Sequence, residues 1–213
     1  MANVKRKRRL SPSFFIIAIP ISFVISVLLL FVILFIFLRA NYTAWEEKFE
    51  GSNREEIIII EKERNQTVLE AVEIFKKSDK KVDFVEIDRN DFANLVGESI
   101  NSNLPTRIKI EKAYVETRTN FWKMYYYVDV KGFGTFWIYF DLNKDAVEST
   151  DLYISDLKIG NLSVRDWGGE GIVANVNAGI KDAMLLITQK DFTGRTIRNI
   201  ELDIESIIIK GEK

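Results

Sequence analysis

The sequence contains neither histidine nor cysteine in its 213 residues. The absence of histidine excludes Ser-His-Asp and Cys-His catalysis and histidine ligands for a metal. The absence of cysteine excludes disulfides, thiolate nucleophiles and cysteine zinc sites. The net charge is −1, so the chain also lacks the basic surplus that binding to phosphate backbones needs. We therefore expect no enzyme, no metal or cofactor, and no nucleic-acid partner.

Charge is also missing from a long segment near the N-terminus. Residues 14–38 hold 25 consecutive uncharged side chains, and as a helix they would extend roughly 37 Å, more than the ~30 Å core of a bilayer. We predict a transmembrane helix here, kinked at Pro20. A cleaved signal peptide is the alternative. Its apolar region would be shorter and end in small residues, whereas Leu38 lies near the expected cleavage site.

A basic cluster precedes this segment. It consists of Lys5, Arg6, Lys7, Arg8 and Arg9. The positive-inside rule places the basic end in the cytoplasm. The prediction is a cytoplasmic tail at 1–13, a membrane span at 14–38, a juxtamembrane helical segment at 39–78 and an exported domain at 79–213. The exported part carries no cysteine, as fits a bacterial envelope that does not rely on disulfides.

The segment 41–78 has an imperfect helical pattern. Ser52 and Glu55 have the spacing of a capping box, which predicts a helix start there. The apolar run Ile57–Ile60 fits either a helix or a buried strand. Two interpretations stay open for the whole segment: a stalk that meets a partner, or a helix that packs on its own domain.

The rest of the chain predicts an α+β domain, with a curved antiparallel sheet packed on one or two helices. Short joints between alternating segments favour antiparallel neighbours. The first strand of the expected meander carries Ile108, Ile110 and Tyr114 at alternate positions. The expected strands are 82–87, 106–117, 121–131, 135–142, 147–164 with a bend after Ile154, and 196–210 with a slip in alternation. The expected helices follow an N-cap at 88–91 and span about 170–188.

Aromatic residues gather on two adjoining strands. Residues 121–140 hold ten of the 26 aromatic side chains, and they occur at both odd and even positions. One face of such a hairpin must be core, but a solvent face needs no aromatic residues. The residues of this second face are Phe121, Tyr125, Tyr127, Trp137 and Tyr139. We predict a ligand or partner surface here, unless the first helix covers it.

Three segments carry a family resemblance. They are the strand 84–88, the helix start 91–95, and the run Leu157-Lys158-Ile159-Gly160-Asn161-Leu162-Ser163-Val164. On the basis of these three segments, residues 82–164 resemble the YpmS-like family of membrane-anchored proteins from Gram-positive bacteria. The sequence departs from the family at Asp166–Gly169, where a proline-containing helix start is expected. The resemblance implies lipid handling by a sheet curved around a helix, and it carries over no functional residue.

Two functions follow as hypotheses. The first is a single-pass membrane-anchored envelope protein whose exported, non-enzymatic domain binds a molecule, with lipid as the ligand that the resemblance implies. The alternative is a structural subunit of an envelope complex, such as secretion, pilus or division machinery. Both give the chain a bilayer as one partner, and the second adds a protein of the envelope.

Overall fold

The computed structural model describes residues 12–118, 121–144, 149–160, 162–188 and 196–213. The chain divides into two compact units, residues 1–49 and residues 50–213. The second unit therefore begins well before position 79, where the pattern of the sequence placed the start of the folded domain.

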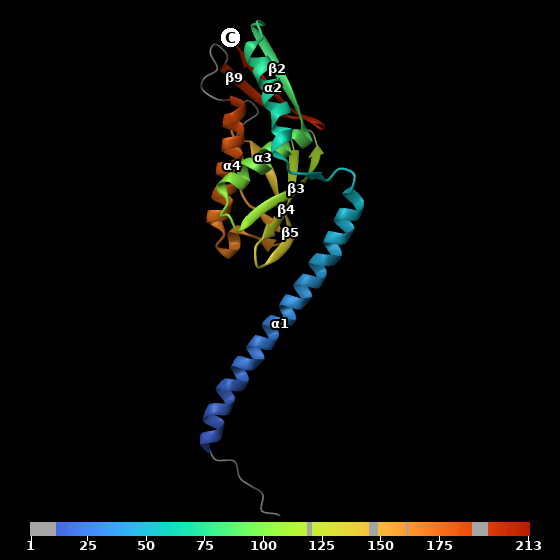
Figure 1. Ribbon diagram of the computed structural model, residues 1–213. Helices are drawn as coiled ribbons and strands as arrows, with labels where there is room; N and C mark the ends of the chain where they lie inside the picture. The colour runs from blue at the N-terminus through green and yellow to red at the C-terminus, as the bar shows by residue number, and fades with distance from the viewer. Residues whose placement is uncertain (1–11, 119–120, 145–148, 161, 189–195) are drawn as a thin grey trace, which may run out of the picture. The chain divides into compact units, whose positions relative to one another are not determined.

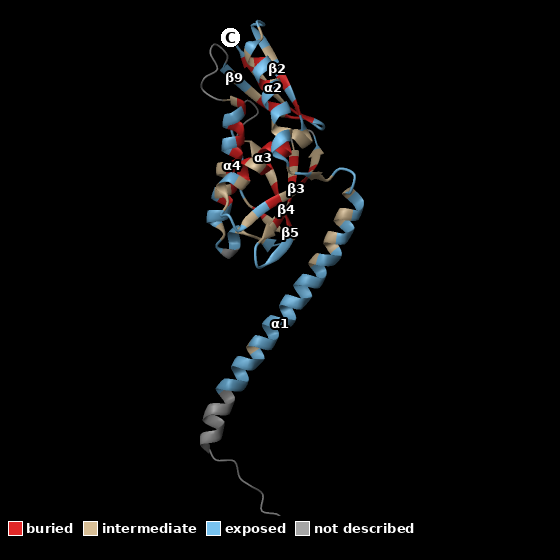
Figure 2. Ribbon diagram, viewed as in Figure 1, coloured by how far each residue is buried: buried red, intermediate tan, exposed pale blue. Residues whose placement is uncertain are grey.

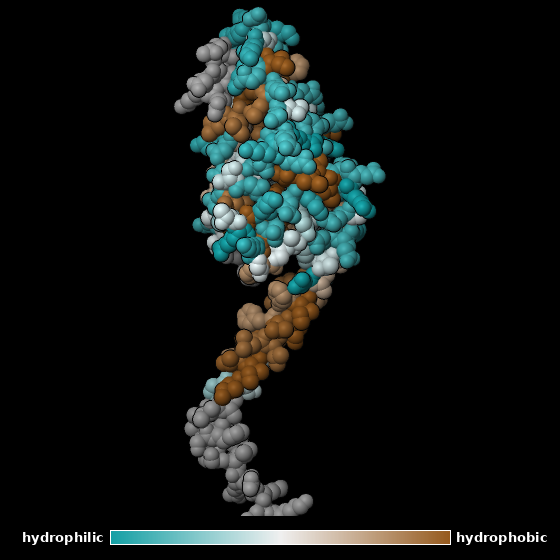
Figure 3. Space-filling view, in the orientation of Figure 1, coloured by the Kyte–Doolittle hydropathy of each residue, from teal (hydrophilic) through white to brown (hydrophobic). Residues whose placement is uncertain are grey.

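Helix α1 spans Pro12–Asn53 and continues without interruption through Pro20; it forms the described part of the first unit, and its last turn, from Glu50, belongs to the second. Among the described residues it is the one helix long and apolar enough to cross a membrane, and Figure 3 shows a continuous hydrophobic stretch along it. The basic cluster Lys5–Arg9 lies outside the described residues. The helix start predicted at Ser52 is wrong, because α1 ends at Asn53, whose carbonyl accepts bonds from the amides of Glu56 and Ile57 in a closing turn.

The unit 50–213 contains two antiparallel sheets (Figure 1). The larger has the order β1-β3-β4-β5-β7-β8, with β6 paired to β5 beside this path. Its strands are β1 (Ile58–Ile59), β3 (Ile108–Arg118), β4 (Phe121–Val130), β5 (Gly134–Lys144), β6 (Leu152–Tyr153), β7 (Lys158–Ile159) and β8 (Leu162–Ser163). The smaller sheet has the order β2 (Val82–Asp88), β10 (Ser206–Glu212), β9 (Thr196–Leu202). The predicted α+β class is confirmed.

The described residues of this unit also form three α-helices, α2 (Asn65–Lys77), α3 (Arg89–Asn103) and α4 (Glu170–Thr188), and two short 3-10 helices, η1 (Lys62–Arg64) and η2 (Arg165–Trp167). Helix α3 begins at the expected N-cap, where Asp88 Oδ1 accepts bonds from the amides of Asn90 and Asp91. Helices α3 and α4 lie side by side (Figure 1). A Cβ at Gly179 would lie 2.5 Å from Ile100 Cα, so only glycine lets the two backbones approach this closely.

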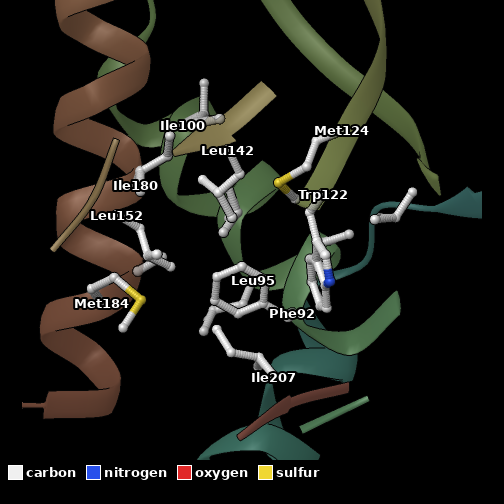
Figure 4. Packing of buried hydrophobic residues seen from close by; sticks show 14 of the residues in the cluster. Phe92, Leu95, Ile100, Trp122, Met124, Leu142, Leu152, Ile180, Met184 and Ile207 are labelled. Carbon is white, nitrogen blue, oxygen red and sulfur yellow. The ribbon is translucent and has the colours of Figure 1, made fainter. Parts of the chain in front are cut away.

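Side chains from both sheets and from these helices meet in one core. Trp122, Tyr126 and Phe140 are at most 1% exposed, and the rings of Phe92 and Trp122 meet edge to face at 5.7 Å. Figure 4 shows Phe92 and Trp122 in this core together with Ile180 and Met184 of α4, and Figure 2 shows buried residues along the strands and on the helices α2, α3 and α4. Helix α2 adds Val68, Val72 and Phe75 to the core. The part of the segment 41–78 that follows α1 therefore packs on its own domain.

Three asparagines on α3 and α4 join these helices to the backbone of other segments. The amide of Asn94, which is fully buried, exchanges two hydrogen bonds with the backbone of Glu61, at 2.7 and 2.8 Å. Asn101 does the same with Ile110, and Asn177 with Ile154. Each side-chain amide thus forms the two hydrogen bonds that the backbone of a neighbouring strand would otherwise form.

Two predicted strands are wrong. The described part of 147–164 forms three two-residue strands, because the amides and carbonyls that would form a ladder bond to side chains instead. Asn177 pairs with Ile154, while Asp156 Oδ1 accepts from the amide of Leu157 and the hydroxyl of Ser163. The described part of 196–210 forms the hairpin of β9 and β10, and the slip in alternation is its turn at 203–205.

Candidate interaction surface

The outer face of the β3–β4–β5 meander is ordered by the strand register into rows of paired residues. One row runs Ile59, Lys112, Tyr127, Trp137 across β1, β3, β4 and β5. The next runs Tyr114, Tyr125, Tyr139, Lys158 across β3, β4, β5 and β7. The third runs Glu116, Lys123, Asp141 across β3, β4 and β5. We call these residues, with Phe121 at the start of β4, the outer aromatic face.

All five aromatic residues singled out in the sequence therefore lie on one face, opposite Trp122, Tyr126 and Phe140. Phe121, Tyr125, Tyr127 and Tyr139 are half-buried, whereas Trp137 is fully buried. The ring centroids of Tyr125 and Tyr139 are 5.3 Å apart, and those of Tyr127 and Trp137 are also 5.3 Å apart. Such separations are typical of favourable aromatic pairs.

Tyr114 belongs to this face although its alternation in the sequence matches the core residues Ile108 and Ile110. A register shift between Ile110 and Lys112 inserts one extra residue, Glu111, into β3. A bulge of this kind turns every later side chain to the opposite face. Ala113 and Val115 are consequently buried in the core, and the ring of Tyr114 packs 5.6 Å from that of Tyr125.

Three tyrosine hydroxyls of the outer aromatic face donate hydrogen bonds within the domain. Tyr125 donates to Glu116 Oε2 at 3.3 Å, Tyr127 to Thr135 Oγ1 at 2.7 Å, and Tyr139 to the carbonyl of Gly160 at 2.8 Å. Burial, helped by the carboxylate of Glu116, raises the pKa of Tyr125 far above its ordinary value. Burial, with Glu56 and Glu116 nearby, also raises the pKa of Tyr114. The phenols of Tyr114 and Tyr125 are therefore neutral at physiological pH.

Trp137 is held differently from its neighbours. Its side chain is fully buried but lies outside the main core cluster. Its indole nitrogen Nε1 donates to Glu50 Oε1 at 3.0 Å, so it ties β5 to the first residue of the folded unit. Trp137 stabilises this part of the domain, and the area available to a ligand is that of Tyr125, Tyr127, Tyr139 and Phe121.

Lysines lie between the rings. The ammonium of Lys112 lies 4.7 Å from the ring centre of Tyr127, and that of Lys123 lies 5.7 Å from both Phe121 and Tyr139. Lys123 also lies 4.0 Å from Asp141 Oδ1, a buried oxygen without a hydrogen-bond partner among the described residues. Cations over aromatic faces are favourable, so the face presents neutral rings together with positive charge.

The outer aromatic face was only partly predicted from the sequence. The pattern of the sequence missed Lys112, Tyr114 and Lys158, because strand pairing and the bulge decide which residues become neighbours. In the part of the chain that the structure describes, no group of three or more acidic residues is placed to hold a metal ion. The tyrosines and lysines of the outer aromatic face supply stacking, hydrogen bonding and positive charge.

Comparison of the chain with family models, curated proteins and solved structures finds no match. The resemblance to the YpmS-like family therefore stays a prediction.

Proposed function

We propose that this chain is a single-pass membrane-anchored envelope protein whose domain, residues 50–213, is a non-enzymatic binding module. The observation that carries the proposal is the outer aromatic face. A sheet face turned away from the core needs no aromatic residues, yet this one pairs Tyr114, Tyr125 and Tyr139 in a ladder beside Tyr127.

The ligand that we propose is an amphiphile with an anionic headgroup, as a membrane lipid has. The large side chains of the inner face, such as Trp122 and Tyr126, pack in the core, so a ligand would bind on the outer face. Aromatic rings offer apolar contact area, while Lys112 and Lys123 over those rings offer positive charge. Tyrosine and tryptophan are also enriched where an apolar and a polar medium meet.

Photocrosslinking in the living host tests this proposal. A photoreactive phenylalanine analogue at Tyr139 probes the outer aromatic face. The same analogue at Phe84, which is 58% exposed on β2, is the control for an exposed aromatic residue elsewhere. We expect a lipid adduct, identified by mass spectrometry, at position 139 and none at 84. Absence of any adduct at 139, or equal lipid adducts at both positions, would contradict the proposal.

A structural subunit of an envelope complex is the second candidate. It is favoured by Ile59, which is 63% exposed and extends the row of Lys112, Tyr127 and Trp137. Tyrosine and tryptophan beside an apolar side chain are typical of protein interfaces. In the same experiment this function gives a protein adduct at 139 in place of a lipid adduct.

A further inference from the structure

The β4–β5 hairpin ends in the most exposed large apolar side chain of the described residues. Phe133 is 90% exposed and lies between Gly132 and Gly134, whose φ angles are 88° and 108°. These left-handed conformations favour glycine. A hydrogen bond from the amide of Phe133 to the carbonyl of Val130, at 2.8 Å, closes the turn. The ring is therefore presented by a short, well-defined turn and does not pack on the domain.

Positive charge lies beside this ring. Arg107 and Lys131 are both exposed, and the amide of Lys131 donates to the carbonyl of Arg107 at 2.8 Å, which places the two residues at the same end of the sheet. Lys109, the next basic residue on β3, is paired with Glu111. An aromatic side chain flanked by basic residues matches the composition of segments that lie at the interface of an anionic bilayer.

The hairpin lies at the end of the sheet where the chain enters the domain. Trp137 on β5 bonds to Glu50 at 3.0 Å, and Phe133 precedes Trp137 by four residues, a distance of roughly 13 Å along a strand. From the end of the uncharged run at Leu38 to Glu50, α1 can extend by about 18 Å at most. The smaller sheet lies at the opposite end of the strands, where Trp122 Nε1 donates to the carbonyl of Asp203.

We infer that this tip, residues 131–134 with Arg107, docks into the surface of the bilayer that α1 spans and orients the domain on it. The inference rests on the proposed membrane anchoring by α1. Docking needs no free-solution affinity, because the anchor keeps the tip within reach of the lipid at a high effective concentration. The outer aromatic face is then held at a fixed height above the headgroups.

The absence of native cysteine allows a clean test with the full chain. An environment-sensitive fluorophore is attached to Phe133→Cys or, as a matched control, to Ile204→Cys. Ile204 is also an exposed apolar turn residue, at 51%, but it lies at the other end, where Thr117 Oγ1 donates to its carbonyl. Each variant is reconstituted into vesicles of phosphatidylglycerol and phosphatidylcholine that contain a lipid with a shallow nitroxide quencher.

We expect strong quenching at position 133 and little at 204. Changing both Arg107 and Lys131 to Gln should reduce the docked population by roughly fivefold for each charge removed. Equal quenching at the two positions, or no quenching at 133 in protein that floats with the vesicles, would overturn the inference while leaving the anchoring intact. A chain that fails to float with vesicles would overturn the anchoring and the inference with it.

The unlabelled chain provides a second measurement. In vesicles the docked tip should protect the bond after Lys131 from trypsin, and Phe133→Ser should restore cleavage to the rate seen in detergent. Because Phe133 is exposed, this change leaves the core untouched. Equal cleavage of the wild-type chain in vesicles and in detergent would also overturn the inference.

Discussion

The two faces of the β3–β4–β5 meander carry similar aromatic residues but hold them in different ways. On the inner face, Trp122 and Tyr126 donate to backbone carbonyls of Asp203 and Ala93 and are fully buried. On the outer face, Tyr125 and Tyr127 are half-buried and donate to side chains of their own sheet. Burial, more than the residue type, separates the aromatic residues that hold the fold from those whose rings reach the surface.

The largest expected effect is on the inner face. Trp122→Ala should lower the free energy of unfolding by about 3–5 kcal/mol, because it removes a fully buried ring and leaves a cavity beside Phe92. Denaturation of the detergent-solubilised chain, followed by far-UV circular dichroism, measures this. Phe133→Ala is the exposed control and should change stability by less than about 0.5 kcal/mol. A loss below about 1 kcal/mol for Trp122→Ala would contradict the assignment of the core.

Trp137 is an exception to the difference between the two faces. Although it lies on the outer face, its burial predicts a loss of about 3 kcal/mol for Trp137→Ala. Trp137→Phe keeps most of the ring and removes only the bond to Glu50, so it should cost about 1 kcal/mol. The same denaturation experiment measures both variants. If alanine cost no more than phenylalanine, Trp137 would belong with the half-buried tyrosines.

Alkaline pH should lower the stability of the domain through the tyrosines of the outer aromatic face. The folded-state pKa values of Tyr114 and Tyr125 are raised above the ordinary value, so the folded state keeps protons that the unfolded chain releases. The stability linked to these phenols is present below about pH 10 and is lost progressively as pH rises above it. Unfolding free energies measured from pH 8 upward should therefore fall above pH 10.

Tyr125→Phe separates this contribution from that of the buried Tyr126, whose pKa burial also raises. The variant should show a shallower alkaline loss of stability than the wild type. An identical slope in both proteins would mean that Tyr125 titrates as an ordinary phenol.

The smallest effect is expected at the lysines. Lys112→Gln removes a charge 4.7 Å from the ring of Tyr127 and should cost about 0.5 kcal/mol of stability, since the pair is partly exposed. Its effect on lipid crosslinking from position 139 should be larger than its effect on stability. A thermal melt and the crosslinking yield of the same variant measure the two; unchanged yield would remove Lys112 from the binding surface.

Regular patterns in the sequence predicted much of the fold. The helix at 170–188 and the strands of the meander follow from alternation and helical spacing, as does the separation of Trp122 from Tyr125. Where side chains replace backbone partners, the same patterns mislead: Asn177 and Asp156 divide the segment 147–164 into short pieces. The bulge at Glu111 similarly moves Tyr114 to the outer face.

Only part of the candidate surface could be predicted from the sequence. Alternation placed five aromatic residues on one face, but it could not show that Trp137 is buried, because the residue that binds it, Glu50, is 87 positions away. Lys112 and Lys158 join the face through strand pairing, which depends on register and turns that no local pattern specifies.

The most direct test of the difference between the two faces is Tyr125→Ala, measured for both stability and binding. In the denaturation experiment used for Trp122→Ala, we expect Tyr125→Ala to cost about 1 kcal/mol. In cells that carry the photoreactive probe at position 139, we expect the same change to abolish most of the lipid adduct. A loss of about 3–5 kcal/mol, equal to that of a core aromatic residue, or an undiminished adduct, would contradict the assignment of the outer aromatic face to binding.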